Sequence, residues 1–329
     1  MRRLILIFGF LGTLFAFAGR ALAQGDEIVA NLAGGRVIIH VARDAIIFGT
    51  IDQPLEAKSV PPRVAEIDLT HIAIFFGASE WQVPAAPKPI RLDRDVPHVY
   101  AANPHNYRPA GAGETDLEEI GVGYLEKLRP LVGQLHSKIE LQPDEPLLQI
   151  VVIGYGPNNY GPEAWLLEYH VEQQQVGAAA NYLQTHVLRP RFTQIYPPEK
   201  HEAHTLVEVR FPNNLQVVPL LGLIQQNDPR IAKLRGSDPR FAKVLETIER
   251  GQANKASPED SADFMRALLP LLAGKAAFIE GTLGETAGFR WVVPPEEPIE
   301  RAKQEPRPGK DTDRPPDAPT LRRKPNPNP

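Results

Sequence analysis

The sequence contains no cysteine, only two methionines, and few aromatic residues among its 329. The absence of cysteine excludes disulfides, cysteine nucleophiles and zinc sites built from thiolates. An excess of one charge is also missing, because 36 basic residues stand against 40 acidic ones and the formal net charge is −4. Such a balance gives no indication of a nucleic-acid partner. Stability must therefore come from apolar burial, and the chain is long enough for one sizeable core.

The first residues have the pattern of an export signal. Two arginines precede an apolar run from Leu4 to Ala18, and the small residues of Ala21-Leu22-Ala23 follow. This order is typical of a cleavable secretory signal, so we expect residues 1–23 to be removed and the protein to be periplasmic or secreted. The alternative is an uncleaved membrane anchor. No later stretch reaches the roughly 20 apolar residues of a membrane helix, and no span is expected after cleavage.

The last residues differ in composition from everything before them. From Pro294 the sequence is proline and charge of both signs, with almost no large apolar side chain. Such a segment cannot bury enough surface to offset its ordering entropy. We therefore expect a disordered tail at 298–329 and a single folded domain at 24–297.

Two strand pairs are predicted in the first part of this domain. The runs "RVIIHVA" and "AIIFGTI" flank a tight turn at Arg43-Asp44, and "RVAEIDL" and "THIAIFFGA" meet at Leu69-Thr70. Because the runs are almost continuously apolar, we expect these strands to be covered on both faces. Residues 81–113 then change character, since proline and glycine leave room for neither a helix nor a long strand. This range is predicted to be an extended surface insertion.

The middle of the chain holds one helix and one more hairpin. Leucines at helical spacing from Thr115 predict a helix, which Pro130 should kink or split. The stretch "IVVIGYGPNNYGPEAWLLEY", residues 150–169, contains glycines that could cradle a phosphate. It lacks the Lys-Ser/Thr ending of a phosphate loop, and a strand rather than a helix follows it. A hairpin is the better interpretation.

The last third is mainly helical. Extended chain broken at Pro197-Pro198 leads into helices that begin at Asp238-Pro239 and Ser257-Pro258, and "GFRWVVP" closes the domain as a strand. The order of strands, helix, strands, helices and strand predicts an α+β layered domain rather than a doubly wound sheet.

The segments "ARDAIIFGTID" and "PRVAEIDLTHIAIFFGA" resemble the opening of proteasome-type β subunits, which are self-processing N-terminal-nucleophile (Ntn) hydrolases. The hairpin "VVIGYGPNNYGPEAWLLEY" is similar to the central hairpin of that family, and "GETAGFRWVVP" to its approach to the last strand. The resemblance covers roughly residues 34–293. It implies a four-layer αββα sandwich, in which two packed antiparallel sheets lie between helices.

The residues do not support the family's chemistry. Its members use a Thr, Ser or Cys exposed as a new N-terminus, with the free amine as base. The corresponding point here is about Arg36, and no hydroxyl or thiol side chain occurs from Gln24 to Arg43. The resemblance matches the supporting acid with Asp52 and the basic residue of the third strand with Arg63. Without a nucleophile these positions indicate a degenerate, non-proteolytic member that needs no cofactor.

Two alternatives remain at this point. A hydrolase with a site outside the family pattern could use a metal at His201, Glu202 and His204, whose side chains suit zinc. The chain could also be an unrelated α+β binding module. Under the primary interpretation the protein acts by binding or assembly through residues 81–113 and 180–212, with a protein partner or a second copy of itself, and whether it is an enzyme stays open.

Overall fold

The computed structural model describes residues 28–55, 59–67, 70–84, 86–94, 112–135, 144–156, 161–176, 183–198, 205–213 and 215–296. The predicted signal segment 1–23, the tail 298–329 and the metal candidates at 201–204 lie outside the described residues. What is described is a mixed α+β structure whose strand pairs are antiparallel, as the order of elements predicted. No helix in the described part is both long and apolar enough to cross a membrane.

Most of the strands belong to two sheets. Sheet A has the strand order β1-β5-β7-β8-β11, with β4 and β6 also paired to β5; its members are β1 (Val29–Ala33), β4 (Arg63–Glu66), β5 (His71–Gln82), β6 (Ile90–Arg91), β7 (Leu148–Gly156), β8 (Gly161–Tyr169) and β11 (Arg191–Tyr196). Sheet B has the order β12-β2-β3-β13-β14; its members are β2 (Gly35–Val41), β3 (Ala45–Asp52), β12 (Leu206–Phe211), β13 (Phe278–Gly284) and β14 (Gly288–Val293). A separate ribbon pairs β9 (Val171–Gln175) with β10 (Leu183–Val187).

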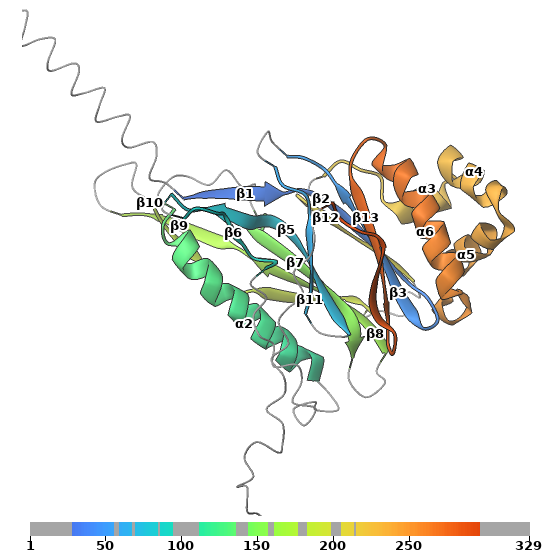
Figure 1. Cartoon of the computed structure of the whole chain (residues 1–329), viewed down its shortest axis with the longest axis horizontal. Coiled ribbons are helices and arrows are strands. Elements are labelled where there is room, and N and C mark those ends of the chain that lie inside the picture. Colours follow the sequence, from blue (N-terminus) through green and yellow to red (C-terminus); the bar gives the residue numbers. More distant parts are fainter. Residues whose placement is uncertain are drawn as a thin grey trace, which may run out of the picture.

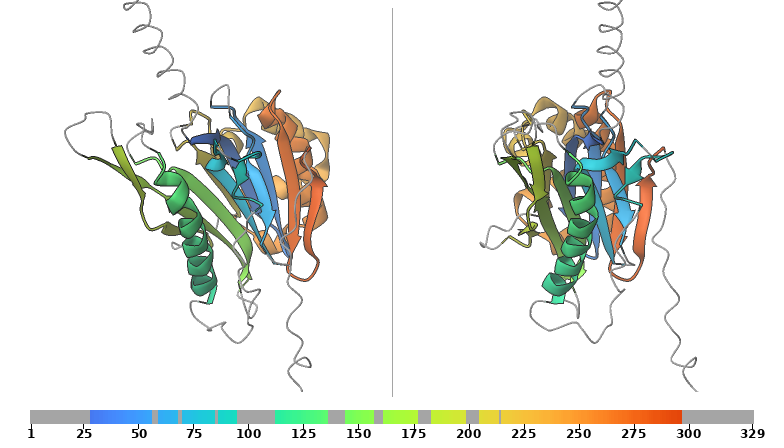
Figure 2. Two further views of the ribbon diagram at one scale, coloured as in Figure 1. Left: turned by 60° about the vertical axis from the view of Figure 1, so that its left-hand side comes forward. Right: turned by 90° about the vertical axis from the view of Figure 1, so that its left-hand side faces the viewer.

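Helices cover one face of each sheet. Helix α2 (Ala112–Val132) packs on sheet A, in a cluster that includes Phe75, Tyr124 and Leu167. Sheet B carries the remaining helices, namely α3 (Leu220–Gln225), α4 (Pro229–Ser237), α5 (Pro239–Glu249), the short 3-10 helix η2 (Ala253–Lys255) and α6 (Pro258–Ala273). Figure 1 shows α2 and the α3–α6 group at opposite sides of the strands, and the turned views of Figure 2 agree.

The sheets face each other across a third apolar cluster. Ile39 and Phe48 of sheet B and Ile74 of sheet A belong to it, and all three are completely buried. The alternation of side chains along a strand explains the division, because neighbouring residues point to opposite faces. In β2, Ile38 packs among the helices while Ile39 packs between the sheets. The continuously apolar strands are therefore covered on both faces, as predicted.

The predicted hairpins are present. Strands β2 and β3 pair with Val41 opposite Ile46, so the turn lies at Arg43-Asp44. Strands β4 and β5 pair with Glu66 opposite Ile72. Strands β7 and β8 pair up to Gly156 opposite Gly161, which confirms a hairpin in place of a phosphate loop.

The predicted insertion 81–113 is shorter in the structure, because β5 extends into its first residues and α2 into its last. Strand β5 continues through Trp81 and Gln82, because the fully buried indole packs under α2 and its Nε1 donates to Ala78 O at 2.9 Å. Helix α2 already begins at Ala112 and runs past Pro130 to Val132, so the proline does not split it. Pro130 has no N–H to donate to the Glu126 carbonyl, and the helix ends two residues after it.

Three helices of the last third begin with the same N-cap motif. Asp228, Asp238 and Ser257 are the N-caps of α4, α5 and α6, and each side chain accepts a hydrogen bond from a backbone N–H in the first turn. A proline follows each cap, where its missing N–H removes no helical hydrogen bond. The predicted start at Asp238-Pro239 is confirmed, with Asp238 as the capping residue.

Candidate functional site

The backbone segments that carry the predicted site positions meet at the first residues of β2. Gly35 lies opposite Asp52 in the β2–β3 register. A Cβ atom on Gly35 would come within 3.2 Å of Pro62 Cγ, so the residue before Arg63 also contacts this point. The backbone around Arg36, Asp52 and Arg63, the three positions matched by the resemblance, is therefore close together at this point.

Their side chains, however, take part in different interactions. The Arg36 guanidinium lies 3.2 Å from Glu208 Oε1 of β12, and both side chains are almost fully buried. Glu208 also accepts from the Leu220 backbone N–H at 2.7 Å, where α3 begins. Arg36 therefore connects β2 to β12 and, through the shared carboxylate, to α3.

Arg63 belongs to sheet A. Its guanidinium lies 3.3 Å from Glu80 Oε2, and Asn31 donates to the other carboxylate oxygen at 2.9 Å. Asp52 Oδ1 is buried without a hydrogen-bond partner among the described residues. Burial raises the pKa of the Asp52 carboxyl above its ordinary value. Arg63 therefore forms an ion pair with Glu80 in sheet A, while Asp52 lies on sheet B.

The chain does not begin at β2. Strand β1 precedes it and pairs with β5 from Val29 opposite Gln82 to Ala33 opposite Gly77, so the backbone passes from sheet A to sheet B at Gly34. The Gly34 carbonyl accepts a hydrogen bond from Gln53 N at 3.1 Å. A Cβ atom on Gly34 would lie 2.5 Å from Leu55 Cγ, which leaves no room for a side chain.

A hydroxyl and an imidazole do meet elsewhere, beneath α6. His40 Nε2 lies 3.2 Å from Ser261 Oγ, and Nδ1 lies 3.2 Å from the Thr205 carbonyl oxygen. Because a carbonyl can only accept, Nδ1 carries the proton and Nε2 accepts from the Ser261 hydroxyl. This is the order of a serine, a base and an orienting acceptor in a nucleophilic site. Both side chains are completely buried, so the pair fastens α6 to sheet B and does not meet a substrate.

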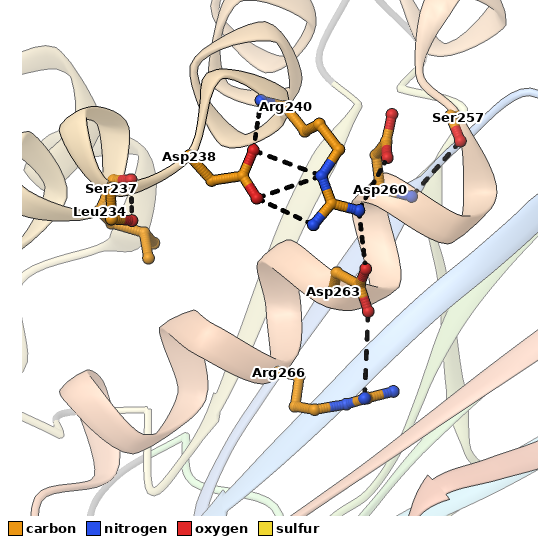
Figure 3. Close-up of polar contacts among 8 residues, drawn as sticks. All are labelled: Leu234, Ser237, Asp238, Arg240, Ser257, Asp260, Asp263 and Arg266. Atoms are coloured by element: carbon orange, nitrogen blue, oxygen red, sulfur yellow. Dashed lines mark hydrogen bonds and ion pairs between the residues drawn. The ribbon is translucent and has the colours of Figure 1, made fainter.

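A charged network joins the start of α5 to α6 (Figure 3). Arg240 contacts Asp238 at 2.8 Å and Asp263 at 3.1 Å, and Arg266 lies 3.9 Å from Asp263. Hydrogen bonds from Arg240 lower the pKa of the Asp238 carboxyl. Ser237 donates to Leu234 O at 2.7 Å within α4, so its hydroxyl has a structural role. These contacts join the start of α5 to α6 near the surface.

One buried acid near this network was missed by the sequence analysis. Glu280 of β13 is completely buried, and neither carboxylate oxygen has a hydrogen-bond partner in the described part of the chain. Burial raises the pKa of its carboxyl to about 7, against the opposing charge of Arg266. The only signal in the sequence is a single acid within the run "AFIEGTLG".

Metal binding has no support among the residues that the structure places. They contain no group of three or more His, Cys, Asp or Glu side chains that could hold an ion. The candidates His201, Glu202 and His204 are outside the described ranges. No protein-family model matches the chain, and no curated protein matches it either.

Proposed function

We propose that the protein is an exported, catalytically silent relative of the proteasome-like Ntn hydrolases, which acts by binding or assembly. The proposal includes the fold of that family, a four-layer αββα sandwich. It is supported by the three apolar clusters, which lie between α2 and sheet A, between the two sheets, and between sheet B and α3–α6.

The observation that carries the silent function is that β2 begins at Gly35, a residue without a nucleophilic side chain. An Ntn nucleophile must be the first residue of its chain, since its own amine is the base. Here the residues before Gly35 form a strand hydrogen-bonded to β5, and Ala33 is completely buried. Cleavage before Gly35 would separate β1 from β2 and expose a glycine, which has no nucleophilic side chain.

A covalent labelling experiment tests this proposal. We expect the purified protein to remain unlabelled by inhibitors that trap N-terminal threonine or serine nucleophiles, and to hydrolyse no peptide in a fluorogenic library. A catalytic threonine protease of the family, treated in parallel, is the control that the reagents are active. Covalent labelling would contradict the silent function, and turnover abolished by a chelator would favour the metal-dependent alternative.

The binding part of the proposal rests on an apolar patch beside the last strand of sheet A. Leu188 and Phe192 are 41 and 36% exposed, and Val122 of α2 is 49% exposed. Helix α2 contacts Phe192 here, because Gly121 lets the helix approach so closely that a Cβ there would be 2.5 Å from Phe192 Cζ. We call these three exposed residues the β11 patch.

We propose a second copy of the chain as the occupant of this patch. Strand β11 ends the order of sheet A and pairs only with β8 among the described strands. An edge strand offers unpaired backbone groups, and a two-fold axis would pair the same edge from each copy. Apolar side chains next to that edge would be covered in the same step.

The oligomeric state tests this assignment. We expect light scattering to give a dimer mass for the protein and a monomer mass for Leu188→Asp. The matched control is Val218→Asp, because Val218 is also exposed, at 51%, but lies just before α3, away from β11. A wild-type monomer, or loss of the dimer in both variants, would contradict the proposed interface while leaving the labelling result unaffected.

A further inference from the structure

Two buried titratable side chains lie on the face of sheet B that α6 covers. Glu280 is opposite Gly49 of β3, and His40 is opposite Ile47 of the same strand. A Cβ on Gly49 would lie 2.5 Å from Leu269 Cδ1 of α6, which shows that this face looks toward the helix. Ile47 and Gly49 are two residues apart on β3 and so point to the same face, and β3 lies between the strands of His40 and Glu280.

His40 is held as a neutral base. Its neighbours across the sheet are Ile47 and Leu206, and its contact on α6 is the Ser261 hydroxyl, so no ionisable group from these elements faces it. Burial lowers the pKa of the imidazole to about 4, and the hydrogen bond to the Thr205 carbonyl only partly offsets this.

Glu280 is held as a neutral acid. Its cross-strand neighbours are Gly49 and Val293, neither of which is ionisable. From α6 it experiences the positive charge of Arg266, which lowers the pKa, and the negative charge of Asp263, which raises it. A carboxylate without any hydrogen bond would be strongly disfavoured in this position, whereas a protonated carboxyl is tolerated.

We infer that His40 and Glu280 form a compensating acid–base pair, which keeps the packing of α6 on sheet B independent of pH across the mildly acidic range. In the folded protein both side chains are uncharged there. In the unfolded chain an imidazole below pH 6.5 is protonated and a carboxyl above pH 4.5 is ionised. Unfolding in this window therefore binds one proton at His40 and releases one at Glu280, and the net proton change is zero.

Taken alone, His40 and Glu280 would make the free energy of unfolding change with pH in opposite directions. The depressed pKa of His40 contributes stability that is present above pH 6.5 and is lost as the pH falls toward about 4. The raised pKa of Glu280 contributes stability that is present below pH 4.5 and is lost as the pH rises toward about 7. Between pH 4.5 and 6.5 the two effects cancel.

The test is the pH dependence of unfolding by urea for wild type and for variants that cannot titrate. Relative to wild type, we expect the unfolding equilibrium constant of Glu280→Gln to fall about tenfold for each pH unit from 4.5 to 6.5. His40→Gln should show the reverse, a rise of about tenfold per unit. The double variant should regain the wild-type pH dependence, and the surface control Glu246→Gln should never lose it.

The inference is overturned if Glu280→Gln keeps the wild-type pH dependence or if the two single variants change it in the same direction. Because a core variant can fail to fold, a second measurement uses the wild-type protein alone. Carbon-13 NMR titration of the Glu280 carboxyl and the His40 ring should give midpoints near 7 and near 4. Midpoints near the ordinary 4.5 and 6.5 would equally overturn it.

Discussion

Sheet A and sheet B each bury a glutamate, and the two side chains have opposite surroundings. Glu80 in sheet A accepts a hydrogen bond from Asn31 and forms an ion pair with Arg63. Glu280 in sheet B has no hydrogen-bond partner within the described residues. A buried carboxyl is accommodated either by a fixed cation or by its own proton. The first solution is an ion pair in sheet A, and the second is an uncharged acid between sheet B and α6, whose own pH dependence His40 offsets.

The largest effect is expected from breaking the network in sheet A. Arg63→Met leaves Glu80 buried without its cation, which should lower the free energy of unfolding by about 3–5 kcal/mol. Urea denaturation measures this, and the double variant Arg63→Met with Glu80→Gln should recover part of the loss. If the single variant costs under about 1 kcal/mol, the pair behaves as a surface ion pair and the comparison fails.

The second largest effect should have the opposite sign. At pH 8 the Glu280 carboxyl is ionised without a partner, so Glu280→Gln should raise the free energy of unfolding by about 1–3 kcal/mol. The gain should disappear at pH 4, where wild-type Glu280 is neutral in both states. A destabilised variant at pH 8 would mean that the ionised side chain has a partner after all.

A smaller effect is expected at the start of α5. Asp238→Ala removes the oxygen that accepts from Arg240 N at 2.8 Å, and loss of such a cap should lower the unfolding temperature. Since burial plays little part here, the loss should be similar at pH 6 and pH 8. Thermal unfolding of Asp238→Ala beside Asp238→Asn separates the cap from the charge. An equal loss in both variants would assign the effect to the ion pair with Arg240.

The smallest effect is expected from an ion pair that is fully on the surface. Glu246 lies 2.7 Å from Arg250 on the solvent face of α5, with both side chains more than half exposed. Glu246→Gln should change stability by about 0.5 kcal/mol or less, and high salt should remove the difference. A change as large as that of Arg63→Met would show that burial does not separate the classes of carboxylate.

The elements that the sequence predicted are those with a local signal. The strand pairs follow from apolar runs bounded by turns, and α5 and α6 from an N-cap followed by proline. Helices α3 and α4 were missed, although Asp228-Pro229-Arg230 repeats the start of α5 at Asp238-Pro239-Arg240. Strand β1 was missed because five residues before a glycine pair carry too little pattern to predict a strand.

For the candidate site, the sequence predicted which strands come close together but not which side chains pair. The strand order placed Arg36, Asp52 and Arg63 near one point, but it could not show that Arg36 and Arg63 pair with Glu208 and Glu80. Such pairs depend on which strands are neighbours within a sheet and on the register between them. The buried pair beneath α6 is harder still, because Ser261 follows His40 by 221 residues. A single polar residue in an apolar run does not indicate its partner.

The central claim is that β1 remains joined to β2, so that no N-terminal nucleophile is formed. The most direct test is the intact mass and the N-terminal sequence of the folded protein purified from its native host. The account predicts a chain that still contains Gly34 and Gly35 and begins upstream of β1, at Gln24 if the predicted signal is removed. A folded protein whose chain begins at Gly35 or Arg36 would contradict it.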